Sequence, residues 1–327
     1  MALRVIEYRQ LLHILVIFMI VQFTGLLLAT QVFTGVTGQQ ATAAQTVSSS
    51  FNAIFYIGYI IVLSVVLLLI FKLYKGDKLF LLLEGAVVVI ASFIFFLVAI
   101  ASLTGSAFAA LFGSGDMAAN ILAIACALGL IIAKYKRPSL RNLTAIIASI
   151  GVGLVLGISF SFLAALIFMV LLAVYDYIAV FVTKHMIALG DMAIAKNLSF
   201  LVMVNEVEAF PSSSLSSSQL KEYRLAKQKD THGITKAAGK GMVPMAARTA
   251  LGTGDLAMPL MLAIAAFKVQ FSFVLSFVVV IGAIFGLILT LLILRRYRRA
   301  LPAIPPLLFG ILVSLSAYYG IMFLLHP

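Results

Sequence analysis

The stretch AARTALGTGDLAMPLMLAIAAFKV, residues 246–269, is apolar and long enough to cross a bilayer, yet it contains a carboxylate. At about 1.5 Å per helical residue, a segment of this length spans the ~30 Å hydrocarbon core. Asp255 lies well inside the stretch, and a charged group at membrane depth is costly and usually functional. A second acid, Asp176, lies in another apolar stretch, residues 143–184. The pair predicts a membrane protein whose site lies within the bilayer.

The composition also indicates a polytopic membrane protein. Hydrophobic residues make up 63% of the 327 residues and charged residues only 10%, unlike the composition of soluble domains. The net charge of +12 does not predict a nucleic-acid partner, because the positive residues lie in short loops, where they orient helices. Cys126 is the single cysteine and no Cys/His cluster forms a zinc motif, so we expect no metal and no cofactor.

The apolar stretches predict an all-α fold with nine transmembrane helices. In chain order they cover residues 11–33, 51–73, 79–103, 117–133, two crossings within 143–184, and then 246–269, 271–294 and 301–325. The long polar interval 185–245 divides the chain into a six-helix part, residues 1–184, and a three-helix part, residues 246–327. The first stretch is too long for a typical signal-peptide core, so we expect it to be retained as a transmembrane helix.

Glycine and serine predict two of the connections between these helices. The Gly/Ser-rich segment 104–116 predicts a loop after the third helix. Between the fifth and sixth helices the turn is predicted from Gly151, Gly153, Gly157 and the stretch Ser159–Ser161. The fifth and sixth helices are therefore expected to be short or tightly joined.

The positive charges predict the orientation of the chain. With a cytoplasmic N-terminus, the clusters at 72–78, 134–141 and 295–299 and the interval 185–245 all face the cytoplasm. Of the 23 Lys and Arg residues, only Lys268 then falls at an outer end. By the positive-inside rule we expect the N-terminus and the 185–245 loop to be cytoplasmic and the C-terminus to be outside.

Asp176 and Asp255 are matched in depth. Asp176 precedes Lys184 by eight residues and Asp255 follows Arg248 by seven, so each lies about 10–12 Å from the cytoplasmic end of its helix. Carboxylates at one depth on consecutive helices can meet and share a proton. Water-mediated hydrolysis of an amide needs such a pair, because one carboxylate takes a proton from water while the other protonates the carbonyl oxygen.

The neighbours of the two acids indicate a special local geometry. Gly252 and Gly254 have no side chains, so another backbone could approach near Asp255. Pro259 removes the helical hydrogen bond to the carbonyl of Asp255 and predicts a kinked or loosened helix there. Tyr175 places a hydroxyl next to Asp176 in the sequence.

Three motifs occur in order on the sixth, seventh and ninth predicted helices: Tyr175-Asp176, Gly252-Thr253-Gly254-Asp255 and Pro302-Ala303-Ile304-Pro305. They resemble the YD, GxGD and PALP motifs of the presenilin and signal peptide peptidase family, with Ile304 in place of Leu, and in particular those of archaeal-type presenilin homologues. The resemblance implies a presenilin-like fold and an intramembrane aspartyl endopeptidase of the GxGD type.

The same resemblance implies roles for individual residues. Asp176 and Asp255 would be catalytic, and their motif neighbours Tyr175, Gly252, Thr253 and Gly254, together with Pro259, would support the site. Pro302, Ala303, Ile304 and Pro305 would support the site and bind substrate. The implied partners are a single-span transmembrane substrate and the lipid bilayer.

Other interpretations of the acids remain open. A proton- or cation-coupled transporter could hold its ion between Asp176 and Asp255, although no internal repeat is evident, and the two acids could merely fix helix packing. A zinc protease would need H-E-x-x-H, which is absent. Gly113–Asp116 also fits GxGD but has no second acid at its depth, so we expect a solvated turn. Glu84 is expected to reach the surface or to pair with a lysine.

Substrate entry leads to a further expectation, because a transmembrane substrate must be unwound before it is cleaved. Residues 198–204 place apolar side chains at alternate positions and predict a strand, which segment 241–245 with Val243 could join beside the seventh helix. An apolar patch resting on the membrane surface is the alternative; the family resemblance favours the strand. The Ser212–Ser218 stretch is expected to be a flexible tether.

Overall fold

The structure is a computed structural model that describes residues 2–34, 77–112, 116–183, 198–211, 242–270, 273–297 and 302–325. The predicted second helix, residues 51–73, and most of the 185–245 interval lie outside these ranges. The predicted count of nine helices therefore stays a prediction. The chain forms two compact units, Met1–Val16 with Met203–Ala250 and Ile17–Val202 with Leu251–Pro327.

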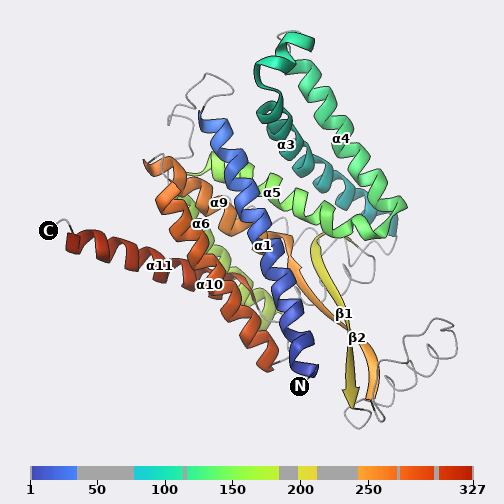
Figure 1. Cartoon of the computed structure of the whole chain (residues 1–327), viewed down its shortest axis with the longest axis vertical. Coiled ribbons are helices and arrows are strands. Elements are labelled where there is room, and N and C mark those ends of the chain that lie inside the picture. Colours follow the sequence, from blue (N-terminus) through green and yellow to red (C-terminus); the bar gives the residue numbers. More distant parts are fainter. Residues whose placement is uncertain are drawn as a thin grey trace. The chain divides into compact units, whose positions relative to one another are not determined.

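Eight α-helices account for most of the described residues (Figure 1). They are α1 (Ala2–Thr34), α3 (Asp77–Phe112), α4 (Asp116–Lys136), α5 (Arg141–Ser159), α6 (Phe162–Tyr177), α9 (Thr253–Gln270), α10 (Phe273–Tyr297) and α11 (Ile304–Leu325). A 3-10 helix, η2 (Pro138–Leu140), precedes α5, and a π-helix, η3 (Ile178–Val182), continues α6. In the described ranges seven helices are long and apolar enough to cross a membrane, and α9 is not among them.

The helix α9 forms the centre of the second unit. Its side chains from Leu256 to Phe267 are almost all buried, and α5, α6 and α10 pack around it. From α1, the Gln22 side chain donates a hydrogen bond of 3.0 Å to the Leu256 carbonyl. A helix that is apolar on every side is stable only when other elements cover it. The helix that begins at the Gly252–Asp255 motif is therefore enclosed by protein.

The glycines of α5 pack against other helices, so the turn predicted from them is shorter than expected. The chain turns at Phe160 and Ser161, and Ser161 caps α6 by accepting from the Ala164 N–H. A Cβ atom at Gly153 would lie 2.7 Å from the Leu260 side chain, and one at Gly157 would lie 2.7 Å from Ile264. Because Gly153 and Gly157 have no side chains, α5 can approach α9 closely, as in small-residue helix interfaces of membrane proteins.

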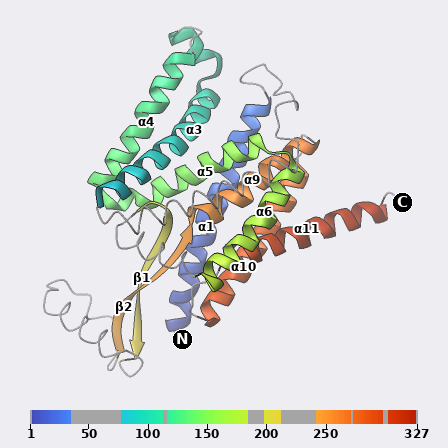
Figure 2. The same ribbon diagram turned by 180° about the vertical axis from the view of Figure 1, so that it is seen from behind.

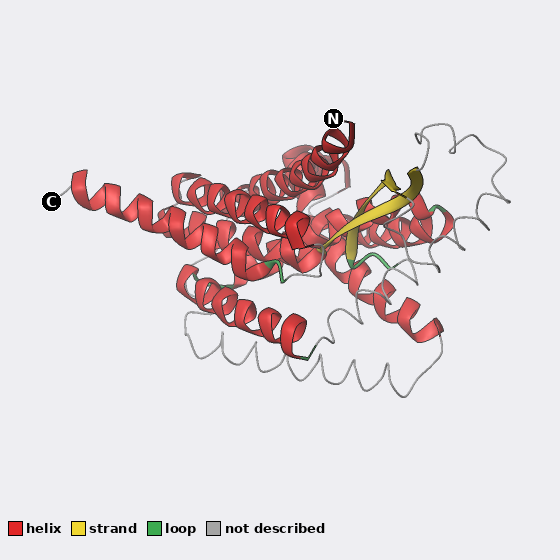
Figure 3. Cartoon of the chain, turned by 90° about the horizontal axis from the view of Figure 1, so that it is seen from below, coloured by secondary structure: helices red, strands yellow, loops and turns green. Residues whose placement is uncertain are grey.

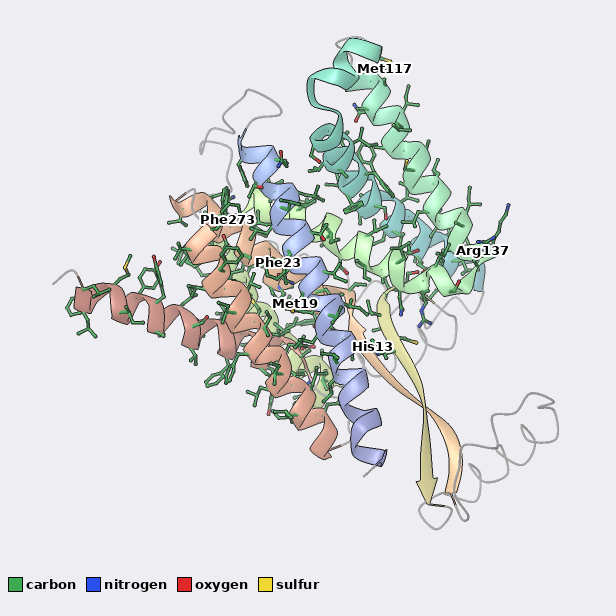
Figure 4. The ribbon with its side chains drawn as sticks, viewed as in Figure 1. His13, Met19, Phe23, Met117, Arg137 and Phe273 are labelled. Atoms are coloured by element: carbon green, nitrogen blue, oxygen red, sulfur yellow. The ribbon has the colours of Figure 1, made fainter. Side chains whose placement is uncertain are left out.

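The helix α3 is longer than the sequence predicted. It continues to Phe112, through most of the 104–116 segment expected to form a loop. Its neighbour α4 then begins at Asp116, and the two helices lie side by side (Figure 1). Figure 4 labels Met117, near the start of α4, and Arg137, the residue after its end. The helix continues because alanine and other apolar residues separate the Gly and Ser residues of this segment. Isolated Gly and Ser lower helix stability only modestly.

Glycines also fix the crossing of α10 and α11. A Cβ atom at Gly310 of α11 would lie 2.2 Å from the Gly282 carbonyl oxygen and 2.6 Å from the Gly286 nitrogen. Ser314 donates a hydrogen bond of 2.9 Å to the Val278 carbonyl across the same interface. The N-terminal end of α11 is thereby directed to α6, against which it packs (Figure 2).

Two strands precede α9 in the fold: β1 (Leu201–Pro211) and β2 (Met242–Gly252) form a two-stranded sheet (Figure 3). The Thr253 N–H donates a hydrogen bond of 3.0 Å to the Phe200 carbonyl, so the start of β1 lies beside the end of β2 and the strands are antiparallel. The predicted helix 246–269 is therefore wrong at its start, because residues 246–252 extend as a strand and the helix begins at Thr253.

Candidate active site

Asp176 lies in the last α-helical turn of α6, and its side chain is 7% exposed. The backbone widens immediately after it into η3, where the Thr183 N–H donates to the Ile178 carbonyl at 3.0 Å. Short π-helical segments within helices frequently occur at functional sites. The α6 helix thus presents Asp176 at a change in its own geometry.

The N-terminus of α11 supplies backbone donors to Asp176. The Ile304 N–H donates to Asp176 Oδ2 at 3.3 Å. The first N–H groups of a helix have no partner within the helix, and Pro305 lacks an N–H altogether. The Pro302–Pro305 motif therefore meets Asp176 through its main chain, at the positive end of a helix dipole.

Asp255 is the third residue of α9 and caps the start of that helix. The Gly252 N–H donates to Asp255 Oδ2 at 3.2 Å. An acidic residue at this position that reaches back to the N–H at the helix cap is one half of a capping box. The Gly252–Asp255 motif is thus a helix start in which the carboxylate is held by the motif's own backbone.

The two glycines of the motif differ in their surroundings. A Cβ atom at Gly252 would lie 3.0 Å from Asp255 Oδ2, whereas a Cβ atom at Gly254 would have nothing within 4 Å. Gly254 is exposed. Among the described residues a Cβ atom at neither glycine would meet another backbone, although the Phe200 carbonyl approaches the N–H of Thr253, which lies between them, at 3.0 Å. Gly252 makes room for the carboxylate, and Gly254 leaves open space beside it.

For the protease that the sequence motifs imply, Gly252→Ala is expected to reduce the cleavage rate by about tenfold or more, whereas Gly254→Ala should leave the rate within about threefold of wild type. The added methyl at position 252 would lie 3.0 Å from Asp255 Oδ2, so the carboxylate must shift by a few tenths of an ångström, and catalysis is sensitive to the position of the reacting groups. Initial rates of both variants at equal folded enzyme test the difference. Equal rates would show that the carboxylate adjusts without cost.

The fold brings Asp176 and Asp255 together. Their helices α6 and α9 pack against each other, and the two carboxyl groups are near enough to interact electrostatically. Tyr175 is half-buried beside Asp176, and Pro259 is buried one turn after Asp255 within a helix that continues through it. In the described ranges no group of three or more His, Cys, Asp or Glu residues could hold a metal ion.

The family model described as signal-peptide peptidase, presenilin aspartyl protease matches residues 15–319 of the chain. The chain belongs to this family. It is therefore an integral, multi-pass membrane protein and a hydrolase, and its family indicates an intramembrane aspartyl protease. No curated protein matches the sequence.

Two solved structures of a presenilin family intramembrane aspartate protease resemble this presenilin-family chain. The one in space group C222 has a TM-score of 0.57 and 19% sequence identity, and the match covers 94% of this chain and 96% of the other. The one in space group P2 has a TM-score of 0.58 and 22% identity, with 95% and 97% of the two chains covered. The resemblance at this level of identity shows that the fold is shared.

One residue that contacts the start of the aspartate helix was not predicted from the sequence. Gln22, which is fully buried, donates to the Leu256 carbonyl, one residue after Asp255. A polar amide within an apolar transmembrane helix must find a partner in a neighbouring helix, and this signal could have identified it. The predicted pairing of Glu84 with a lysine is confirmed: Lys134 Nζ lies 2.6 Å from Glu84 Oε1.

Proposed function

We propose that the protein is an intramembrane aspartyl endopeptidase of the GxGD type in which Asp176 and Asp255 form the catalytic pair. The observation that supports this most strongly is that α6 and α9 pack against each other and each presents a carboxyl group held at Oδ2 by a backbone N–H. The proposed substrates are single-span transmembrane proteins, which share the bilayer with the enzyme.

In the proposed reaction, one carboxylate takes a proton from a water molecule as that water attacks the carbonyl carbon of the peptide bond. The other carboxyl group protonates the carbonyl oxygen, and the tetrahedral intermediate then breaks at the C–N bond as the nitrogen gains a proton. Backbone donors suit this chemistry because an amide N–H orients a carboxylate without exchanging a proton with it. Both donors belong to helix starts, which are rigid elements.

In this proposal the substrate lies in the open space beside Gly254, next to the Asp255 carboxylate. Gly254 is exposed and has no side chain, and Asp255 follows it directly. An extended peptide could approach the Asp255 carboxylate through this space, which is open enough that nothing lies within 4 Å of a Cβ atom placed at Gly254. Pro302–Pro305, whose backbone contacts Asp176, would border the same space from the other side of the pair.

The proposal is tested with detergent-solubilised enzyme and a single-span test substrate, with the products identified by mass spectrometry. Two acids that share one proton should give a bell-shaped dependence of the cleavage rate on pH, because only the singly protonated pair is active. A transporter would instead give proton- or ion-coupled flux in sealed vesicles. Flux without any peptide product would favour the transporter over the protease.

The strands β1 and β2 support a further part of the proposal, in which an unwound substrate adds to the sheet as another strand. Backbone groups exposed by unwinding at membrane depth need new partners, and a sheet edge provides them. The strand β2 leads directly into α9 at Thr253, two residues before Asp255. A substrate paired with β2 would therefore be guided to the catalytic pair.

Val243→Pro is expected to lower the cleavage rate by about tenfold or more, because proline removes a backbone donor from β2. Shortening the stretch Ser212–Ser218, which lies outside the described residues, serves as the control and should leave the rate nearly unchanged. Rates are measured on the single-span test substrate at equal enzyme concentration. Wild-type activity in Val243→Pro would exclude strand addition while leaving the aspartate pair intact.

A further inference from the structure

A buried ion pair lies on α3 and α4, outside the aspartate pair. Lys134 Nζ donates to Glu84 Oε1 at 2.6 Å and to Oε2 at 2.8 Å, and the two side chains are 3% and 0% exposed. Burying two charges costs desolvation energy that their attraction often fails to repay, so apolar residues would hold the helices together at least as well. The pair therefore calls for an explanation other than the packing of α3 on α4.

Glu84 has a third contact, which reaches a different part of the chain. The Ser199 N–H donates to Glu84 Oε1, and Ser199 is itself buried. Its neighbour Phe200 accepts a hydrogen bond at its carbonyl from the Thr253 N–H at 3.0 Å. Two hydrogen bonds and one short piece of backbone, Ser199–Phe200, thus connect Glu84 with Thr253, the first residue of α9.

The end of this connection is the Gly252–Asp255 motif. Thr253 follows Gly252, whose N–H holds Asp255 Oδ2 at 3.2 Å. The first N–H groups of a helix have no helical acceptor, so the direction in which α9 starts depends on the acceptor that the Phe200 carbonyl provides. That carbonyl is held in place from the other side by the bond between Ser199 and Glu84.

We propose that Glu84 is a positioning residue for the protease reaction: held by Lys134, it fixes the Ser199–Phe200 turn, and the turn fixes the start of α9 and the carboxylate of Asp255. The inference rests on the proposed function of Asp255. The helices α3 and α4 contain neither Asp176 nor Asp255. The proposal gives them a part in setting the catalytic geometry. The element that acts on the turn is the acceptor oxygen of residue 84, and the ammonium group of Lys134 holds that oxygen.

Two double variants separate the acceptor oxygen from the charges. Glu84→Gln with Lys134→Met removes both charges but keeps a side-chain oxygen that can accept from the Ser199 N–H. Glu84→Leu with Lys134→Met removes the same charges, nearly conserves volume and leaves no acceptor. We expect kcat of the Gln/Met variant to stay within about threefold of wild type and kcat of the Leu/Met variant to fall about tenfold or more, with KM little changed.

A structural control lies one turn from Glu84 on the same helix. Val88 is buried, and Val88→Ala loosens the packing of α3 without removing the acceptor. It should lower the melting temperature and leave kcat per folded enzyme unchanged. Hydrogen exchange gives a readout independent of activity: the amides of Ser199 and Thr253 should exchange faster than in wild type in the Leu/Met variant only.

Equal kcat values in the two double variants, or a loss of kcat in Val88→Ala as large as in Leu/Met, would overturn the positioning role. Unchanged exchange at Ser199 and Thr253 in the Leu/Met variant would overturn it as well. Failure of the proposed function appears differently, as activity that survives replacement of Asp176 or Asp255. In that case the exchange measurement still reports whether Glu84 orders the start of α9.

Discussion

Replacing Asp176 or Asp255 by alanine is expected to lower the rate of cleavage of a single-span substrate by about 1,000-fold or more, while Asp116→Ala retains the wild-type rate. General acid and general base each contribute about 100- to 10,000-fold, and neither can act without the other in a pair that shares a proton. Asp116 begins α4 and belongs to a sequence that also fits GxGD, so it is a matched control for the motif alone.

Alanine also removes a hydrogen-bond acceptor from the start of a helix, and asparagine separates this effect from catalysis. Asp255→Asn keeps a side-chain oxygen for the Gly252 N–H, and Asp176→Asn keeps one for the Ile304 N–H. Both should fold with melting temperatures close to that of wild type and still be inactive. Cleavage at the wild-type rate by either asparagine variant would show that the acids are structural helix caps and that the catalytic pair is wrongly assigned.

Gly151→Ala is expected to destabilise the protein by about 3 kcal/mol or more, since overpacking of a tight interface costs about 1–3 kcal/mol even where side chains can move. Here they cannot relieve the clash, because a Cβ atom at position 151 would lie 1.9 Å from the Ala91 backbone oxygen of α3. The helices α3 and α5 would have to separate. Thermal unfolding in one detergent gives the measurement.

Gly129→Ala is the matched control for this change. Nothing lies within 4 Å of a Cβ atom at Gly129 in α4, and alanine favours a helix over glycine by about 0.5–1 kcal/mol. The melting temperature of Gly129→Ala should therefore equal or exceed that of wild type. A Gly151→Ala variant as stable as Gly129→Ala would show that α3 and α5 do not pack as closely as described.

The sequence predicted those parts of the molecule that depend on local composition. Apolar length located the helices from residue 117 to residue 182 and from 273 to 325, and the depth of Asp176 and Asp255 indicated that the two acids could meet. The start of α9 was misplaced because residues 246–252 are apolar enough for a helix or a strand. The pattern of Gly252 and Asp255 three residues apart is a helix-start signal that outweighs the hydropathy of that stretch.

Other features were beyond sequence reasoning because they join distant residues. Gly153 and Gly157 look alike whether they turn the chain or admit a neighbouring helix, and only the position of α9 decides between the two. A lysine partner was expected for Glu84, but the partner is Lys134 on the next described helix, 50 residues away. The bond from Ser199 to Glu84 spans 115 residues, and no periodicity in the chain predicts it.

The burial of α9 has a consequence for assigning sidedness to proteins of this kind from hydropathy alone. The helix that contains Asp255 is 18 residues long, is enclosed by protein, and falls outside the set of described helices that could cross a membrane by length and hydropathy. A hydropathy scan that omits α9 reverses the predicted direction in which every later helix crosses the membrane. It would assign α10 and α11 the reverse direction and move the basic cluster at 295–299 to the opposite face. The charge rule would then contradict the count, and that contradiction is the sign that a buried central helix has been passed over.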